Sequence, residues 1–190
     1  GQGQVQRGRV DPHGDFHFHT GRPLARRLQY DSALVDAVPD AAVESFAGVG
    51  NPMILRNLDS GERVVDIGSG GGFDCFYDPV QTGPTGQITG IDMTDEMLTK
   101  SRATARAMGL DHVEFKDGLI EAMPVDDNAV DVVISYGVIN LYPDKEQVFG
   151  KIFQMLKPGG RVLNRRGKMS TYGRLELPVA FRVKAGGQCL

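Results

Sequence analysis

The chain has 190 residues, with 41% hydrophobic and 24% charged side chains, which is ordinary for one globular domain with a sizeable core. Its net charge of −3, without a strongly basic stretch, argues against a nucleic-acid partner. The apolar runs are too short to span a membrane, and the opening GQGQVQRGRV lacks the apolar core of a secretory signal. Two cysteines, Cys75 and Cys189, do not make a disulfide framework, so we expect a cytoplasmic protein.

The first 50 residues have the pattern of an extension in front of the main domain. The segment PLARRLQY predicts a helix with Pro23 in its first turn. Two short helical patterns follow before Gly48. The residues expected to open them are Asp31 or Ser32 for the first and Pro39 for the second.

Strands and helices alternate in the rest of the chain. Short apolar runs predict strands, and the periodic stretches between them predict helices, one of which has Thr94 or Asp95 as its cap and Gly109 past its end. This alternation predicts a parallel sheet, with helices on both faces because the strands are apolar throughout. The fold class is therefore α/β: a three-layer Rossmann-like sandwich with a mostly parallel sheet. The expected strands are 63–67, 87–91, 113–115, 130–135 and 161–163, and the expected helices are 96–108 and 145–156.

A glycine-rich loop follows the first strand and precedes a helix, in the run DIGSGGG from Asp66 to Gly72. Open α/β sheets bind ligands beyond the carboxyl ends of their strands, and glycines allow positive φ and close approach to a ligand. By itself, the loop is also compatible with a tight turn that binds nothing. Asp92, about 20 residues further on at the end of the second strand, can accept hydrogen bonds from both ribose hydroxyls. Together the two features predict a nucleoside-containing ligand.

Two ligand classes compete for this loop: a dinucleotide and S-adenosylmethionine (SAM). The dinucleotide fingerprint needs a small third residue where the helix packs against the strand, and counting from Gly68 that place is taken by Phe73. The loop instead reads G-x-G-x-G with Asp66 just before it. The amino-acid end of SAM is shorter than a pyrophosphate and carries an ammonium, which suits a nearby carboxylate. SAM is therefore preferred, with an NAD-dependent oxidoreductase as the alternative.

Several segments between Gly61 and Leu163 resemble those of class I SAM-dependent methyltransferases: VVDIGSGGG, GIDM, KDG, VDVVIS and LKPGGRVL, in this order. More narrowly, GSGGGFDCF, GPTGQITGIDMTDEML, PVDDNAVDVVIS and GVINLYPDKEQVF resemble arsenite methyltransferases and their relatives. The resemblance implies SAM as the cofactor and methyl transfer to a small acceptor as the activity. The acceptor itself is not readable from these residues.

The resemblance also implies roles for residues at matching positions. The glycine loop would line the methionine part of SAM, the end of the second strand would hold the ribose and adenine, the end of the third would bind the adenine amino group, and the end of the fourth would border the methyl group. Taken singly, Met93 is equally compatible with the core, and Asp117 with a turn. No catalytic residue is assigned, and no metal is expected. The complete implied SAM-binding set is Asp66, Gly68, Ser69, Gly70, Gly72, Asp92, Met93, Asp117, Gly118, Leu119, Ser135 and Tyr136.

The sequence departs from the resembling enzymes at the positions of their thiols. Those enzymes carry a cysteine just after the fourth strand, where this chain has Gly137. Cys75 matches a family cysteine but has no thiol partner except Cys189, and one thiol cannot build a three-coordinate arsenic site. We therefore interpret Cys75 as a small, half-buried residue on the first helix.

Two further departures concern the fold. The first helix contains Asp78-Pro79, so it should end or kink there. The chain ends soon after Asn164, where the resembling enzymes continue with more strands and a substrate-binding part. We expect at most one hairpin around Pro178, an incomplete C-terminal edge of the sheet, and a homodimer through that edge. The alternative function is then a SAM-binding remnant without turnover.

These interpretations divide the chain into three parts: an N-terminal extension over the cleft (1–50), a SAM-binding core (51–164) and a short atypical tail (165–190). The extension contains His13, His17 and His19, which could form a metal site. We prefer the interpretation that this segment packs over the ligand cleft.

Overall fold

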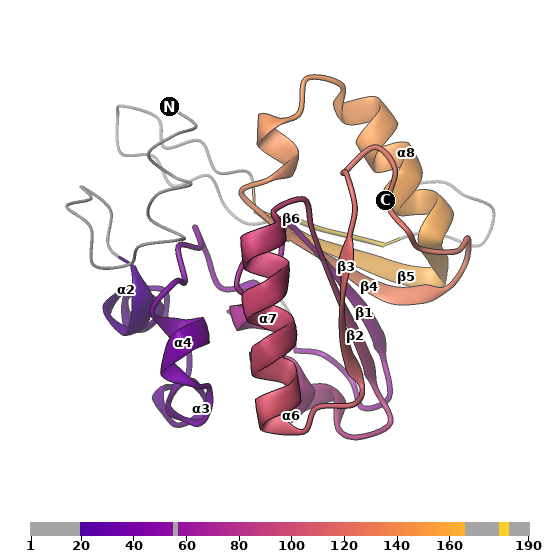
Figure 1. Ribbon diagram of the computed structural model, residues 1–190. Coiled ribbons are helices and arrows are strands. Elements are labelled where there is room, and N and C mark those ends of the chain that lie inside the picture. The colour runs from indigo at the N-terminus through magenta and orange to yellow at the C-terminus, as the bar shows by residue number, and fades with distance from the viewer. Residues whose placement is uncertain (1–19, 55–56, 166–178, 183–190) are drawn as a thin grey trace.

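The computed structural model describes residues 20–54, 57–165 and 179–182. Its strands are β1 (Arg63–Ile67), β2 (Gln87–Asp92), β3 (Val113–Asp117), β4 (Val130–Tyr136), β5 (Leu156–Arg165) and β6 (Val179–Arg182). They form one sheet in the order β3-β2-β1-β4-β5-β6 (Figure 1). β1 to β5 pair in parallel, and β6 pairs antiparallel with β5. The strand order reverses between β1 and β4, which is where open α/β sheets bind their ligands.

Helices cover both faces of this sheet. One face packs against α5 (Phe73–Tyr77) and α7 (Asp95–Met108), and the other against α8 (Lys145–Met155). The buried side chains accordingly form two clusters, because alternate residues of the central strands point to opposite faces. Val64 and Val132 belong to the first cluster, and Val65 and Val133 to the second. The predicted three-layer Rossmann-like sandwich is confirmed.

The N-terminal helices α2 (Gly21–Arg27), α3 (Ser32–Ala37) and α4 (Asp40–Val43) pack on the α7 side of the sheet (Figure 1). Asp31 caps α3, because its side chain accepts from the backbone N–H of Ala33 at 2.8 Å. The Tyr30 ring meets the rings of Phe46, Phe73 and Tyr77 edge-on, with centroids 5.0 to 5.6 Å apart. The extension therefore shares the core of the sheet domain.

The predicted break at Asp78-Pro79 is present. α5 ends at Tyr77, and α6 (Pro79–Thr82) begins with the proline in its first turn. Because proline lacks an N–H and clashes with the preceding turn, a regular helix cannot run through this point without a kink or a break.

The C-terminal part of the sheet differs from the prediction. β5 begins at Leu156 rather than at the predicted residue 161, and α8 ends at Met155 rather than at the predicted residue 156. The reason is that Leu156 already pairs with Val130 of β4, before a shift in register. β6 pairs along β5, so the edge that we expected to be open is covered by the chain itself. The other expected strands and the helix of residues 96–108 lie within one or two residues of their predicted ends.

Some predictions fall outside the described ranges: those on His13, His17 and His19, on Cys189, and on most of the tail. Within residues 20–54, 57–165 and 179–182, no helix combines the length and the apolar character needed to cross a bilayer.

Candidate functional site

The glycine loop lies at the carboxyl end of β1, beside the point where the strand order reverses. Gly68, Gly70 and Gly72 have φ of 79°, 54° and 86°, in the left-handed region that favours glycine. A Cβ on Gly68 would stand 2.1 Å from Cγ2 of Val138, so a larger residue does not fit. The N–H of Gly68 donates to the carbonyl of Ile91 at 2.8 Å, which ties the loop to β2.

Asp92 at the end of β2 supports the loop directly. Its Oδ2 accepts from the N–H of Gly70 at 2.8 Å, and its Oδ1 accepts from the N–H of Thr94 at 2.9 Å. The residue is buried. A carboxylate offers about four acceptor positions, so two remain for the hydroxyls of a ligand. Asp92 therefore both shapes the loop and retains the capacity expected of a ribose-binding residue.

The predicted adenine-binding residues gather beside Asp92. Asp117, at the end of β3, pairs in register with Asp92. The N–H of Gly118 donates to the backbone carbonyl of Asp92 at 3.2 Å. Met93 is 70% exposed, so the alternative that it belongs to the core is wrong. Leu119 is likewise exposed, at 49%. Exposed apolar side chains next to such a carboxylate suit the face of a base.

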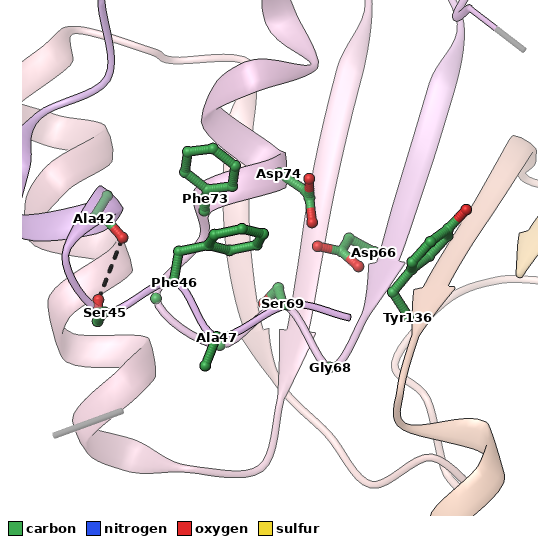
Figure 2. A pocket seen from close by; sticks show the side chains of 13 residues that line it. Ala42, Ser45, Phe46, Ala47, Asp66, Gly68, Ser69, Phe73, Asp74 and Tyr136 are labelled. Carbon is green, nitrogen blue, oxygen red and sulfur yellow. Dashed lines mark hydrogen bonds between the residues drawn. The ribbon is translucent and has the colours of Figure 1, made fainter. Parts of the chain in front are cut away.

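A pocket opens next to the glycine loop (Figure 2). The space inside it that a water-sized molecule can reach measures about 50 Å³. The carboxylates of Asp66 and Asp74 point toward one another between Phe46 and Tyr136 in this view. The lining residues are Ala42, Ser45, Phe46, Ala47, Gly48, Asp66, Gly68, Ser69, Gly70, Gly71, Phe73, Asp74 and Tyr136.

Only some of the predicted SAM-binding residues line the pocket. Ser135 lies behind it, fully buried, with its Oγ donating to the carbonyl of Ile67 at 3.4 Å. Gly72 starts α5 and packs against aromatic rings. The residues at the ends of β2 and β3 lie outside the lining. The predicted residues that line it are Asp66, Gly68, Ser69, Gly70 and Tyr136.

Sequence reasoning expected the N-terminal extension to cover the cleft, but it did not identify the segment that forms one wall of this pocket, and it missed one of the pocket's carboxylates. The wall is residues 42–48, whose Phe46 ring lies 4.2 Å from that of Phe73, centroid to centroid. Asp74 is the missed carboxylate. In the sequence it is indistinguishable from an acidic residue that stabilises the first turn of a helix. Its one available signal was its place immediately after the glycine loop.

The carboxyl groups near the loop have unusual electrostatics. Burial, and next the charge of Asp74, raise the pKa of Asp66 well above its usual range. Burial raises the pKa of Asp74 to about 6, although the hydroxyl of Tyr30, 2.6 Å from its Oδ1, opposes the shift. Burial and the charges of Asp74 and Asp66 likewise raise the pKa of Asp78. Burial thus disfavours the charged form of all three carboxyl groups, and a nearby cation would offset that cost.

The thiol positions are unfavourable for binding a soft metal. Cys75 is completely buried, rather than half-buried as predicted, and its Sγ lies 3.6 Å from Oδ2 of Asp66. Burial, and then Asp66, raise the pKa of this thiol well above its usual value, so it stays protonated. Gly137 has φ of 83°, and a Cβ there would lie 3.2 Å from Cγ2 of Val49. The positions expected for thiols thus hold one protonated thiol and one glycine.

The family follows from comparison with known proteins. The model of a methyltransferase domain matches residues 58–172, which is more than half of the chain. The chain belongs to this methyltransferase family. The loop, Asp92 and the end of β3 all lie inside the matched segment, whereas residues 42–48 lie before it.

Individual relatives of this methyltransferase are arsenite methyltransferases. This chain is 44% identical over 138 residues to the arsenite methyltransferase of Halobacterium salinarum, and the match covers 73% of this chain and 35% of that protein. The human arsenite methyltransferase is 30% identical over 200 residues, covering 99% of this chain and 51% of that protein. An arsenic(III) SAM methyltransferase crystal structure from Chlamydomonas reinhardtii matches with a TM-score of 0.63 and 35% identity, covering 70% of this chain and 46% of that one.

This methyltransferase therefore spans about a third to a half of the length of these relatives. Its family and its structural neighbours have SAM as their cofactor, and nothing in the comparisons supports the oxidoreductase alternative.

Proposed function

We propose that this chain binds SAM and transfers its methyl group to a small acceptor. The pair of carboxylates that lines the pocket at the glycine loop, Asp66 and Asp74, carries the proposal. Opposite charges at close range inside a protein attract strongly, so the pair suits the ammonium of an amino-acid ligand. The same pair would repel the pyrophosphate of a dinucleotide. Phe73 in the glycine-loop sequence favoured SAM over a dinucleotide, and the two carboxylates support the same choice independently.

The other predicted residues fit the remaining parts of SAM. Asp92 has acceptor positions for ribose hydroxyls, and Met93 and Leu119 present apolar surface for adenine. Asp117 would accept from the adenine amino group, with Gly118 beside it. Tyr136, at the end of β4, lines the pocket and would border the reacting methyl group, whereas the buried Ser135 behind it would support that strand end.

When bound, SAM supplies a methyl group on a positively charged sulfur. The part of the protein is to hold the acceptor in line with that carbon and to exclude water. Tyr136 and the wall of residues 42–48 lie on the pocket and are the elements that would do so.

SAM and S-adenosylhomocysteine should each stabilise the fold. At about 100 times its Kd, a ligand that binds only the native state adds about 2.7 kcal/mol to the free energy of unfolding. A thermal melt with each nucleoside measures this, and NADH serves as the control that should give no shift. An unchanged melting temperature at millimolar SAM would reject the proposal. Consumption of SAM in the presence of candidate acceptors then separates an enzyme from a SAM-binding remnant.

Arsenite should not be methylated by this chain at a useful rate. Arsenic(III) needs several thiolates, whereas Cys75 is buried and protonated and Gly137 supplies no sulfur. The assay is incubation with SAM, glutathione and arsenite, followed by detection of methylated arsenicals. Turnover that disappears in Cys75→Ser would show that this interpretation of the site is wrong.

The remaining parts of the proposal concern location and partners. We infer a cytoplasmic protein from the small number of cysteines, of which Cys75 is a free thiol. The net charge of −3 supports a role without nucleic acid. A homodimer through a sheet edge stays a prediction, and among the described strands the edges are now β3 and β6.

A further inference from the structure

Three buried carboxyl groups lie close together behind the glycine loop. Asp66 comes from β1, Asp74 lies in α5, and Asp78 follows directly after α5. The N–H of Asp78 donates to the carbonyl of Asp74 at 2.8 Å, so the two residues lie one helical turn apart. Asp66 and Asp74 line the pocket, but Asp78 does not. We call these three residues the acid cluster.

The acid cluster has an excess of negative charge when ionised. Asp78 has no exposed surface, and neither of its carboxylate oxygens has a hydrogen-bond partner among the described residues. In the described ranges, every ion pair involves other residues, so no lysine, arginine or histidine there neutralises the cluster. The titratable groups around it are all neutral or acidic: Tyr30, Asp31, Cys75, Tyr77, Asp92 and, across the pocket, Tyr136.

A buried carboxylate without a counter-charge is costly, so such a cluster either holds protons or receives a cation from outside. The hydrogen bonding around Asp74 does not supply that counter-charge. The hydroxyl of Tyr30 lies 2.6 Å from Oδ1 of Asp74 and 3.1 Å from the carbonyl of Gly50, and with one proton it can donate to only one of them. Tyr30 therefore gives Asp74 at most one neutral donor, which leaves the charge of the cluster in place.

We propose that the acid cluster distinguishes SAM from its product S-adenosylhomocysteine by charge, releasing protons when the sulfonium form is bound and taking them back when the sulfur is neutral. This rests on the proposed function. The two nucleosides share the ammonium, so that group does not separate them. During methyl transfer an electron pair of the acceptor forms the new bond to carbon, and the pair of the broken carbon–sulfur bond stays on sulfur. The ligand thus loses one positive charge, and the cluster balances the loss with protons from solvent.

The sign of the pH dependence follows from this exchange. Binding that releases protons becomes tighter as the pH rises, and a full extra proton changes the Kd tenfold per pH unit. The preference for SAM, expressed as the Kd of S-adenosylhomocysteine divided by that of SAM, should therefore increase with pH. The range of roughly pH 5.5 to 7 is suitable, because the amino group of both ligands stays charged there.

Isothermal titration in buffers of different ionisation enthalpy counts the protons released by each ligand. We expect a larger count for SAM than for S-adenosylhomocysteine, and a SAM preference that rises with pH. Equal counts and a preference that does not change with pH would overturn the inference. Failure of both ligands to bind would instead contradict the proposed function.

Asp78→Asn tests the cluster without changing the pocket lining, because the shape of the side chain is kept. We expect it to reduce the SAM preference and the difference in proton count, while binding of S-adenosylhomocysteine changes little. Asp111→Asn, an exposed residue before β3, removes a charge outside the cluster and should change neither quantity. A merely structural role of Asp78 would weaken both ligands equally. If Asp78→Asn does not fold, the proton counts of the unaltered chain still decide.

Discussion

Replacing Arg161 by methionine is expected to lower the free energy of unfolding by about 3–5 kcal/mol. Arg161 of β5 is 6% exposed and forms a two-pronged ion pair with Glu62, its Nη2 lying 2.7 Å from Oε2. Its Nη2 also donates to the carbonyl of Asn57 at 3.2 Å. Without the arginine, the carboxylate of Glu62, which is only 14% exposed, loses its counter-charge and has little water to replace it.

Urea denaturation measures the loss, and Lys157→Met is the matched control. Lys157 pairs with Asp131 in the same region, but these side chains are 37% and 29% exposed, so the change should cost less than about 1 kcal/mol. Adding Glu62→Gln to Arg161→Met should recover part of the stability, because the unpaired charge is then gone. Similar losses for the two single variants would contradict the argument from burial.

Asp92→Ala is expected to weaken SAM binding by about 1.5–3 kcal/mol, or roughly 10- to 150-fold in Kd. Two effects contribute. The ribose hydroxyls lose their charged acceptor, and the N–H of Gly70 loses the carboxylate that holds the loop in place. The second effect acts even on a ligand that lacks the ribose hydroxyls.

Asp95→Ala is the control for this change. It lies close by in the first turn of α7 but is exposed, and Thr94 rather than Asp95 is the residue at the cap position. Titration calorimetry of both variants with SAM gives the comparison, with a melt of each free protein to show that it is folded. Equal Kd values would mean that Asp92 has been assigned wrongly.

The sequence predicted those parts of the fold that depend on local patterns. The central strands are apolar on both faces, so their limits were visible without knowledge of their partners. Pro79 and Gly109 each fixed the end of a helix through their own backbone restrictions. The glycine loop and Asp92 were predictable because their spacing along one βαβ unit is itself local.

The parts that were missed depend on contacts between distant segments. Leu156 belongs to a strand because Val130 lies beside it, which no property of the helix end reveals. The pocket wall needs Phe46 to lie against Phe73, and this is a matter of aromatic packing between segments that are separate in the chain. The burial of Cys75 and Asp78 likewise follows from what covers α5 rather than from the residues themselves.

The wall formed by residues 42–48 determines where the protein can be truncated and which positions can be substituted. A fragment cut to begin at residue 58, where the family match starts, would keep the glycine loop but expose Phe73 and Tyr77 to water. Such a fragment should aggregate, because a contiguous aromatic surface would lose its cover. Conversely, substitutions at Ser45 or Ala47 can reshape the opening without touching any strand. Under the proposed function, substitutions in this short segment should change which acceptors are methylated while the affinity for SAM stays nearly the same.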